Sequence, residues 1–162
     1  RHTRFRNVTG VQTCALPISG LMWARTFQDR LGSWYQLRDK SQTQSLTQCL
    51  EEINAWWFRW PWCAYRLHWD DQDSWPDPWQ LLEEPRLCPL ARGLGIMYTL
   101  ALLDSHDLTG TRMVEQDSDN LVLVSNEKYI LNCDWEPVVN IAPRAAQIRH
   151  QISLVQIQKR II

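Results

Sequence analysis

The chain has 162 residues, of which 17 are Lys or Arg and 18 are Asp or Glu, so its formal net charge is −1. This length suits one domain with a substantial hydrophobic core, and the near balance of charge argues against nucleic-acid binding through a basic surface. The longest apolar run, residues 94–103, is too short to cross a bilayer, so we expect no membrane-spanning segment.

The first 18 residues resemble the translation of a sequencing-library adaptor, because residues 1–4 and 8–18 fit its constant regions. We therefore leave them out of the fold and expect them to be disordered. Without Arg1, Arg4 and Arg6, 14 basic residues remain against 18 acidic ones, a net charge of −4. A secretory signal peptide is the alternative, but polar residues and a proline interrupt its apolar stretch, so we do not expect secretion by that route.

Two amphipathic helices are predicted after this segment. The first covers residues 22–40, and the second follows Ser45, which forms a capping-box pattern with Gln48 and should end before Pro61. We expect the two to form a hairpin. The apolar face of the first helix comprises Trp23, Phe27, Leu31 and Trp34.

Seven of the ten tryptophans lie between residues 56 and 79, a stretch also broken by three prolines. A buried aromatic side chain covers about 150–250 Å², so these rings must form the wall of a core or the floor of a surface groove. The seven are Trp56, Trp57, Trp60, Trp62, Trp69, Trp75 and Trp79.

Two further helices begin at prolines. Asp77 before Pro78 is a strong N-terminal cap and predicts a short helix over residues 78–83. A longer helix, from Pro89 to about residue 103, has the most apolar sequence in the chain and should be central to the core.

The pattern becomes extended after residue 110. Three short segments, 112–116, 121–124 and 128–131, predict a three-stranded antiparallel meander. Helices followed by a small sheet indicate an α+β class, with one domain over residues 19–141. Residues 142–162 are ambiguous: Ile148, Ile152 and Val155 favour a helix, whereas Val155, Ile157 and Ile161 suit a strand.

The cysteine spacing indicates neither a zinc ribbon nor a redox dithiol, because no pair is separated by two residues. With no export signal, the thiols are expected to be reduced. Cys88 directly precedes Pro89, so its sulfur should lie at the positive end of a helix dipole, where thiolate nucleophiles are favoured. The alternative is a small buried residue at a helix start.

Residues 86–134 resemble transglutaminase-like and related bacterial cysteine peptidases. These proteins place a catalytic cysteine at the start of a central helix, histidine on one following strand and aspartate on the next. Cys88 matches the cysteine, but Asn120 and Asn132 stand where the family has histidine and aspartate. Asparagine cannot act as a general base near neutral pH, so the resemblance implies a degenerate site.

A second resemblance concerns residues 68–82 and 88–100, which are similar to an uncharacterised protein family of tailed phages, particularly T4-like phages of marine cyanobacteria. The similarity covers most of residues 26–141. It implies a viral origin, and it brings no established activity.

The tryptophans and the nearby carboxylates raise two further possibilities, an aromatic binding surface and a cation site. Exposed tryptophans could stack on sugars or on a partner protein, with Trp69, Trp75, Trp79 and His68 as candidates. A hard-cation site is not expected, since the carboxylates between residues 70 and 77 lack the calcium-loop spacing and more often cap turns. We expect neither metal nor cofactor.

The sequence therefore predicts a phage-type α+β domain, without catalysis, that binds a phage or host protein in the virion or host cytoplasm. The alternatives are a cysteine hydrolase or acyl-transfer enzyme that uses Cys88 with Asn120 and Asn132, and a carbohydrate-binding module that uses exposed tryptophans.

Overall fold

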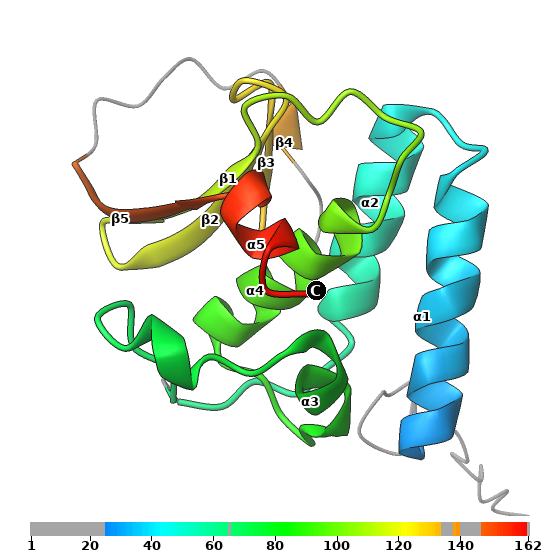
Figure 1. Ribbon diagram of the computed structural model, residues 1–162, viewed down its shortest axis with the longest axis horizontal. Coiled ribbons are helices and arrows are strands. Elements are labelled where there is room, and N and C mark those ends of the chain that lie inside the picture. The colour runs from blue at the N-terminus through cyan, green and yellow to red at the C-terminus, as the bar shows by residue number, and fades with distance from the viewer. Residues whose placement is uncertain (1–24, 65, 134–137, 140–146, 162) are drawn as a thin grey trace, which may run out of the picture.

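The computed structural model describes residues 25–64, 66–133, 138–139 and 147–161; the adaptor-like residues 1–18 lie outside this part. The described chain is an α+β fold in which helices lie to one side of an antiparallel sheet (Figure 1). No described helix combines the length and apolar character that crossing a membrane requires. The helices are α1 (Phe27–Ser41), α2 (Leu46–Trp57), α3 (Pro78–Glu83), α4 (Pro89–Ala101) and α5 (Leu154–Gln158).

Local capping explains where these helices begin. Thr26 and Asp29 form a capping box at α1, Ser45 accepts a hydrogen bond from the Gln48 amide at α2, and Asp77 caps α3 with Pro78 in its first turn. These contacts satisfy backbone N–H groups that the first helical turn leaves free. The predicted starts of α2, α3 and α4 are confirmed, while α1 begins at Phe27.

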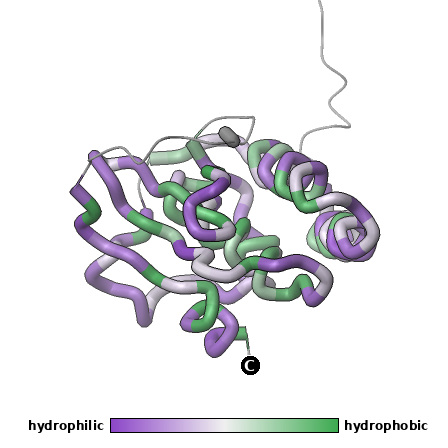
Figure 2. The backbone as a smooth tube through the Cα atoms, turned by 90° about the horizontal axis from the view of Figure 1, so that it is seen from above, coloured by the Kyte–Doolittle hydropathy of each residue, from purple (hydrophilic) through white to green (hydrophobic). Residues whose placement is uncertain are grey.

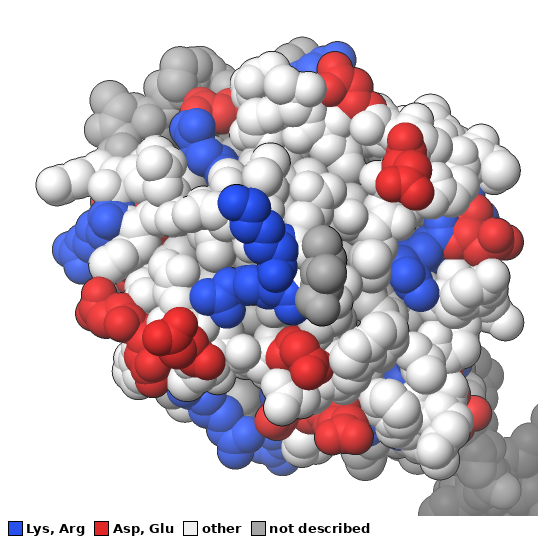
Figure 3. Space-filling model, in the orientation of Figure 1, with Lys and Arg blue, Asp and Glu red and all other residues white. Residues whose placement is uncertain are grey.

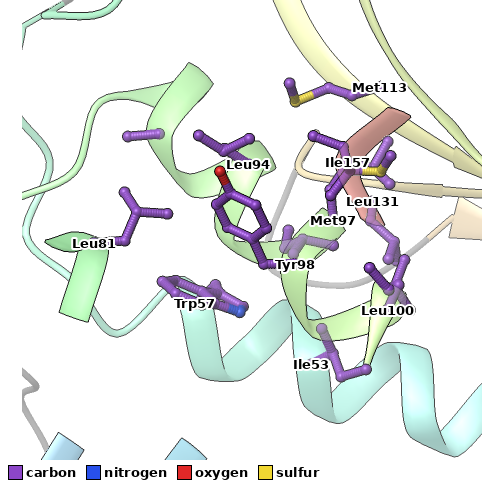
Figure 4. Packing of buried hydrophobic residues seen from close by; sticks show 14 of the residues in the cluster. Ile53, Trp57, Leu81, Leu94, Met97, Tyr98, Leu100, Met113, Leu131 and Ile157 are labelled. Atoms are coloured by element: carbon purple, nitrogen blue, oxygen red, sulfur yellow. The ribbon is translucent and has the colours of Figure 1, made fainter. Parts of the chain in front are cut away.

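Helix α4 is the centre of the core. It packs against α2, α3, α5, β1 and β2, and Figure 2 shows the α1–α2 pair on one side and the sheet on the other. Figure 4 shows Tyr98 of α4 beside Trp57 of α2, with Met113 and Leu131 of the sheet on the far side. Gly95 permits this packing, because a Cβ there would lie 2.6 Å from the Trp57 ring.

The sheet has five antiparallel strands in the order β4-β3-β2-β1-β5. The predicted meander corresponds to the first three strands in chain order, which confirms the α+β class. The predicted number of strands was too low, because two more strands join the sheet. Positive φ angles at Asp117 and Ser118 form the tight turn between β1 and β2. The strands are β1 (Arg112–Gln116), β2 (Asp119–Val124), β3 (Tyr129–Leu131), β4 (Val138–Val139) and β5 (Ile148–Ser153).

The C-terminal residues, for which the sequence suggested either a helix or a strand, form a strand followed by a helix. Residues 148–153 form a strand on the free edge of β1, and the helix comes afterwards, started by a capping box between Ser153 and Gln156. Ile152 and Ile157 are buried in the common core. The domain boundary expected at residue 141 therefore does not separate residues 148–161 from the rest.

Candidate functional site

Cys88 occupies the N-cap of α4, as predicted. Its Sγ accepts a hydrogen bond from the Ala91 amide at 3.5 Å, and the residue is 1% exposed. Arg92 lies one turn into the helix with its guanidinium over the Phe58 ring, 3.9 Å from the ring centroid. Burial lowers the pKa of Arg92, and the charge of Cys88 acts in the opposite direction. The sulfur is thus near a partly buried cation but closed to solvent.

Asn132 links Asn120, another predicted site position, to the start of α4. Its Nδ2 donates to the Pro89 carbonyl at 2.8 Å and to the Asn120 carbonyl at 2.6 Å. Its backbone N–H donates to Asn54 Oδ1 at 3.0 Å. The structure therefore brings β2, the end of β3 and the start of α4 together around one amide.

Asparagine suits position 132 for two physical reasons. The residue has φ 65°, a left-handed conformation that asparagine adopts more readily than most residues. Its side chain must also donate to two carbonyl oxygens, which an ionised aspartate cannot do. We refer to Asn120, Asn132 and the Pro89 carbonyl as the amide joint.

Trp69 covers the Asn120 side of this joint. Its indole Nε1–H donates to Asn120 Oδ1 at 2.8 Å, so the asparagine side chain is held by a buried tryptophan. The neighbouring Trp75 indole donates to the His68 carbonyl at 2.8 Å, and the Trp69 and Trp75 rings meet at 73°. Both rings are buried, which rules out the predicted exposed platform at Trp69 and Trp75.

The Cys88 sulfur accepts its hydrogen bond from the Ala91 amide and not from a histidine. His106 bonds the Ser41 carbonyl, and His68 is exposed. His150 stacks on the Trp69 ring, with ring centroids 5.7 Å apart, and its Nε2 lies 3.7 Å from Glu115 Oε2. The contacts of His106 and His150 are thus with groups other than the Cys88 thiol.

Among the acidic residues between 70 and 77, Asp77 caps a helix with its carboxylate and Asp71 takes part in a turn through its backbone carbonyl. Asp77 Oδ1 accepts from the amides of Trp79 and Gln80, and the Asp71 carbonyl accepts from Ser74. Within the part of the chain that the structure describes, no group of three His, Cys, Asp or Glu side chains is arranged to hold a metal.

A different surface carries exposed aromatic side chains. Tyr35 of α1 is 63% exposed and Trp79 of α3 is 46% exposed. Trp79 meets the buried Trp34 edge-on at 5.8 Å, and Arg38 lies 4.3 Å from the Trp34 centroid and 5.8 Å from that of Tyr35. We call Tyr35, Arg38 and Trp79 the α1–α3 aromatic surface.

Sequence reasoning found only Trp79 of this surface. Tyr35 and Arg38 lie three residues apart on the outer face of α1, and this helical spacing could have been recognised in the sequence. Their connection to Trp79 runs through Trp34 and depends on the packing of α1 against α3, which no local pattern indicates.

Comparison with protein-family models, with curated proteins and with solved structures gives no match.

Proposed function

We propose that this protein is a non-catalytic interaction domain that binds a partner protein through the α1–α3 aromatic surface. The observation that carries the proposal is the exposure of Tyr35 and Trp79, with Arg38 over Tyr35 and both Arg38 and Trp79 in contact with Trp34. Tryptophan, tyrosine and arginine are the residue types most enriched in binding hot spots. Trp79 rests on the buried Trp34 ring, so this anchor is held in place before binding.

Arg38 indicates the chemistry of the partner. Its Nε is buried and has no hydrogen-bond partner within the described residues, and none of the described carboxylates forms an ion pair with it. Burial lowers the pKa of Arg38, and Tyr35 opposes this. The matching partner segment presents a carboxylate flanked by apolar side chains, which would pair with the guanidinium and cover both rings.

Charge elsewhere on the surface favours a protein partner over nucleic acid. On the face shown in Figure 3, Lys and Arg side chains lie among Asp and Glu side chains, and no broad basic patch is formed. A nucleic-acid surface would need such a patch. The viral origin inferred from residues 68–82 and 88–100 would make the partner a virion or host protein.

The amide joint supports the non-catalytic part of the proposal. The fold has a cysteine-capped helix followed by three strands, the element order that the transglutaminase-like resemblance led us to expect, and the joint brings the two asparagine positions to the start of that helix. Both asparagine side chains are committed to buried hydrogen bonds. We therefore propose a scaffold of that type in which a structural joint has replaced the catalytic base.

The cysteine hydrolase remains the second candidate, because Cys88 does cap α4. A cysteine nucleophile needs a base within about 2.6–3.2 Å, or slightly more in the free protein. That candidate predicts hydrolysis of an activated acyl ester that is lost in Cys88→Ser and retained in Cys133→Ser.

A peptide-display selection tests the proposed surface. Random linear peptides are selected on the full chain, and the affinities of the enriched peptides are then measured by calorimetry. We expect acidic peptides with flanking apolar residues, whose affinity falls about tenfold or more in Trp79→Ala, Tyr35→Ala and Arg38→Met. Arg38→Met keeps the apolar stem over Trp34 and removes only the charge.

Trp62→Ala is the matched control, because Trp62 is 65% exposed but belongs to the paired segments around residues 62 and 87. Peptides that bind equally well to all the α1–α3 variants would contradict the proposal, as would peptides lost only in Trp62→Ala. A selection that enriches no peptide on the wild-type chain would also contradict it.

A further inference from the structure

Two segments far apart in the sequence run side by side at the start of α4. The Leu87 amide donates to the Pro61 carbonyl at 3.1 Å, and the Cys63 amide donates to the Leu87 carbonyl at 3.2 Å. These bonds form a parallel bridge in which Trp62 lies opposite Leu87. The next residue on each segment is a cysteine, so Cys63 and Cys88 follow as neighbours.

This arrangement is compatible with a disulfide. Cys88 is still in an extended conformation, with φ −78° and ψ 164°, before the helix begins. Neighbouring strands lie about 4.8 Å apart, and disulfides join residues whose Cα atoms are about 4.4–6.8 Å apart. Both residues are free thiols in the structure.

The electrostatic environment of Cys63 agrees with the proximity of the two thiols. The pKa of Cys63 is raised, first by burial and then by the charge of Cys88. Cys88 therefore lies within the electrostatic reach of Cys63. Arg66 and Arg86 act in the opposite direction and lower the Cys63 pKa.

We propose that Cys63 and Cys88 form a reversible disulfide by exchange with a small-molecule disulfide such as glutathione disulfide. Cys63 reacts first, because it is partly exposed whereas Cys88 is closed to solvent. The Cys63 thiolate attacks one glutathione sulfur and releases one glutathione. The Cys88 thiolate then attacks the Cys63 sulfur and releases the second. The two protein thiols lose two protons and two electrons, and glutathione disulfide is reduced to two molecules of glutathione.

The disulfide would close the loop that contains Trp69, Trp75 and α3. This loop covers the amide joint and carries Trp79, so oxidation would fix the aromatic segment to the start of α4. Cross-linking a loop of this size restricts the unfolded chain, and the melting temperature should rise by about 10 °C. The proposal concerns a modification site and stands independently of the partner surface.

Peptide mapping of the full chain tests the proposal. The protein is treated with glutathione disulfide at mildly alkaline pH, quenched with acid and digested with trypsin without reduction. Cleavage after Arg59, Arg66, Arg86 and Arg92 gives one peptide of residues 60–66 and one of residues 87–92. We expect these two peptides to be joined, and a mild reductant to separate them.

Variants identify the order of the two steps. In Cys88→Ser the reaction should stop with glutathione on Cys63, and in Cys63→Ser neither the disulfide nor an adduct on Cys88 should form. Cys133→Ser, which removes an exposed thiol, should leave the cross-link unchanged. Glutathione that persists on Cys63 of the wild-type chain would overturn the proposal.

A comparison within the wild-type chain keeps the test valid if a variant fails to fold. The cross-link should form at least about tenfold faster in the native protein than in guanidinium, because the fold holds the thiols together. Equal rates, or preferential pairing of other cysteines in the native protein, would overturn the proposal.

Discussion

Thr99 is the residue on which the tryptophan core depends most clearly. Its Oγ1 accepts hydrogen bonds from the indoles of both Trp34 and Trp57, each at 2.9 Å, and donates to the Gly95 carbonyl at 2.9 Å. All of these groups are buried. One hydroxyl on α4 therefore satisfies a tryptophan from α1 and another from α2.

Thr99→Val keeps the shape of the side chain and removes both acceptor lone pairs. Each buried donor left without a partner costs about 1–3 kcal/mol, so we expect the free energy of unfolding to fall by about 2–5 kcal/mol. A domain of this size has about 5–15 kcal/mol in total. Thr99→Ser keeps the hydroxyl and loses one methyl group, which should cost about 1 kcal/mol.

Guanidinium unfolding monitored by circular dichroism measures this difference. A second background sharpens the test: when Trp34 and Trp57 are both phenylalanine, no indole donor remains, and Thr99→Val should cost less than about 1 kcal/mol. The reasoning is refuted if Thr99→Val is no more destabilising than Thr99→Ser in the wild-type chain.

Three further predictions concern the same core. Gly95→Ala should destabilise by about 1–3 kcal/mol, because its Cβ would lie 2.6 Å from Trp57, whereas Gly32→Ala, with no atom within 4 Å, should stabilise by about 0.5–1 kcal/mol in the same unfolding assay. Burial raises the pKa of Tyr98 to about 12 from 10.0, so stability should fall by about 2 kcal/mol as pH rises across that interval, and ultraviolet titration should show a late phenol that is absent in Tyr98→Phe. Asn132→Asp should cost about 2–4 kcal/mol, because a carboxylate would face two carbonyl oxygens, and should cost more than Asn132→Gly, which keeps the backbone conformation; the opposite order would contradict the amide joint.

The elements predicted best from the sequence are those determined by neighbouring residues. Asp77 before Pro78 and Cys88 before Pro89 set the starts of α3 and α4, because capping involves atoms within one helical turn. The same holds for the turns of the meander. Cys88, Asn120 and Asn132 were also predicted to lie in one region, and Asn132 connects Asn120 to the start of α4.

The features that the sequence did not indicate depend on distant contacts. Residues 148–153 form a strand because they pair with the free edge of β1. No local periodicity in the sequence indicates this pairing. Trp69 and Trp75 can be buried in the core since Asn120 and the His68 carbonyl satisfy their N–H groups. The pairing of Cys63 with Cys88 likewise arises from a bridge between segments 25 residues apart.

The most direct test of the non-catalytic proposal is the order in which the cysteines are alkylated. The native protein is treated with iodoacetamide at mildly acidic pH, and the labelled peptides are quantified by mass spectrometry over time. We predict that Cys133, which is exposed, is labelled first and that Cys88 is labelled only after unfolding. Labelling of Cys88 ahead of Cys133 in the native protein would identify an activated nucleophile and contradict the proposal.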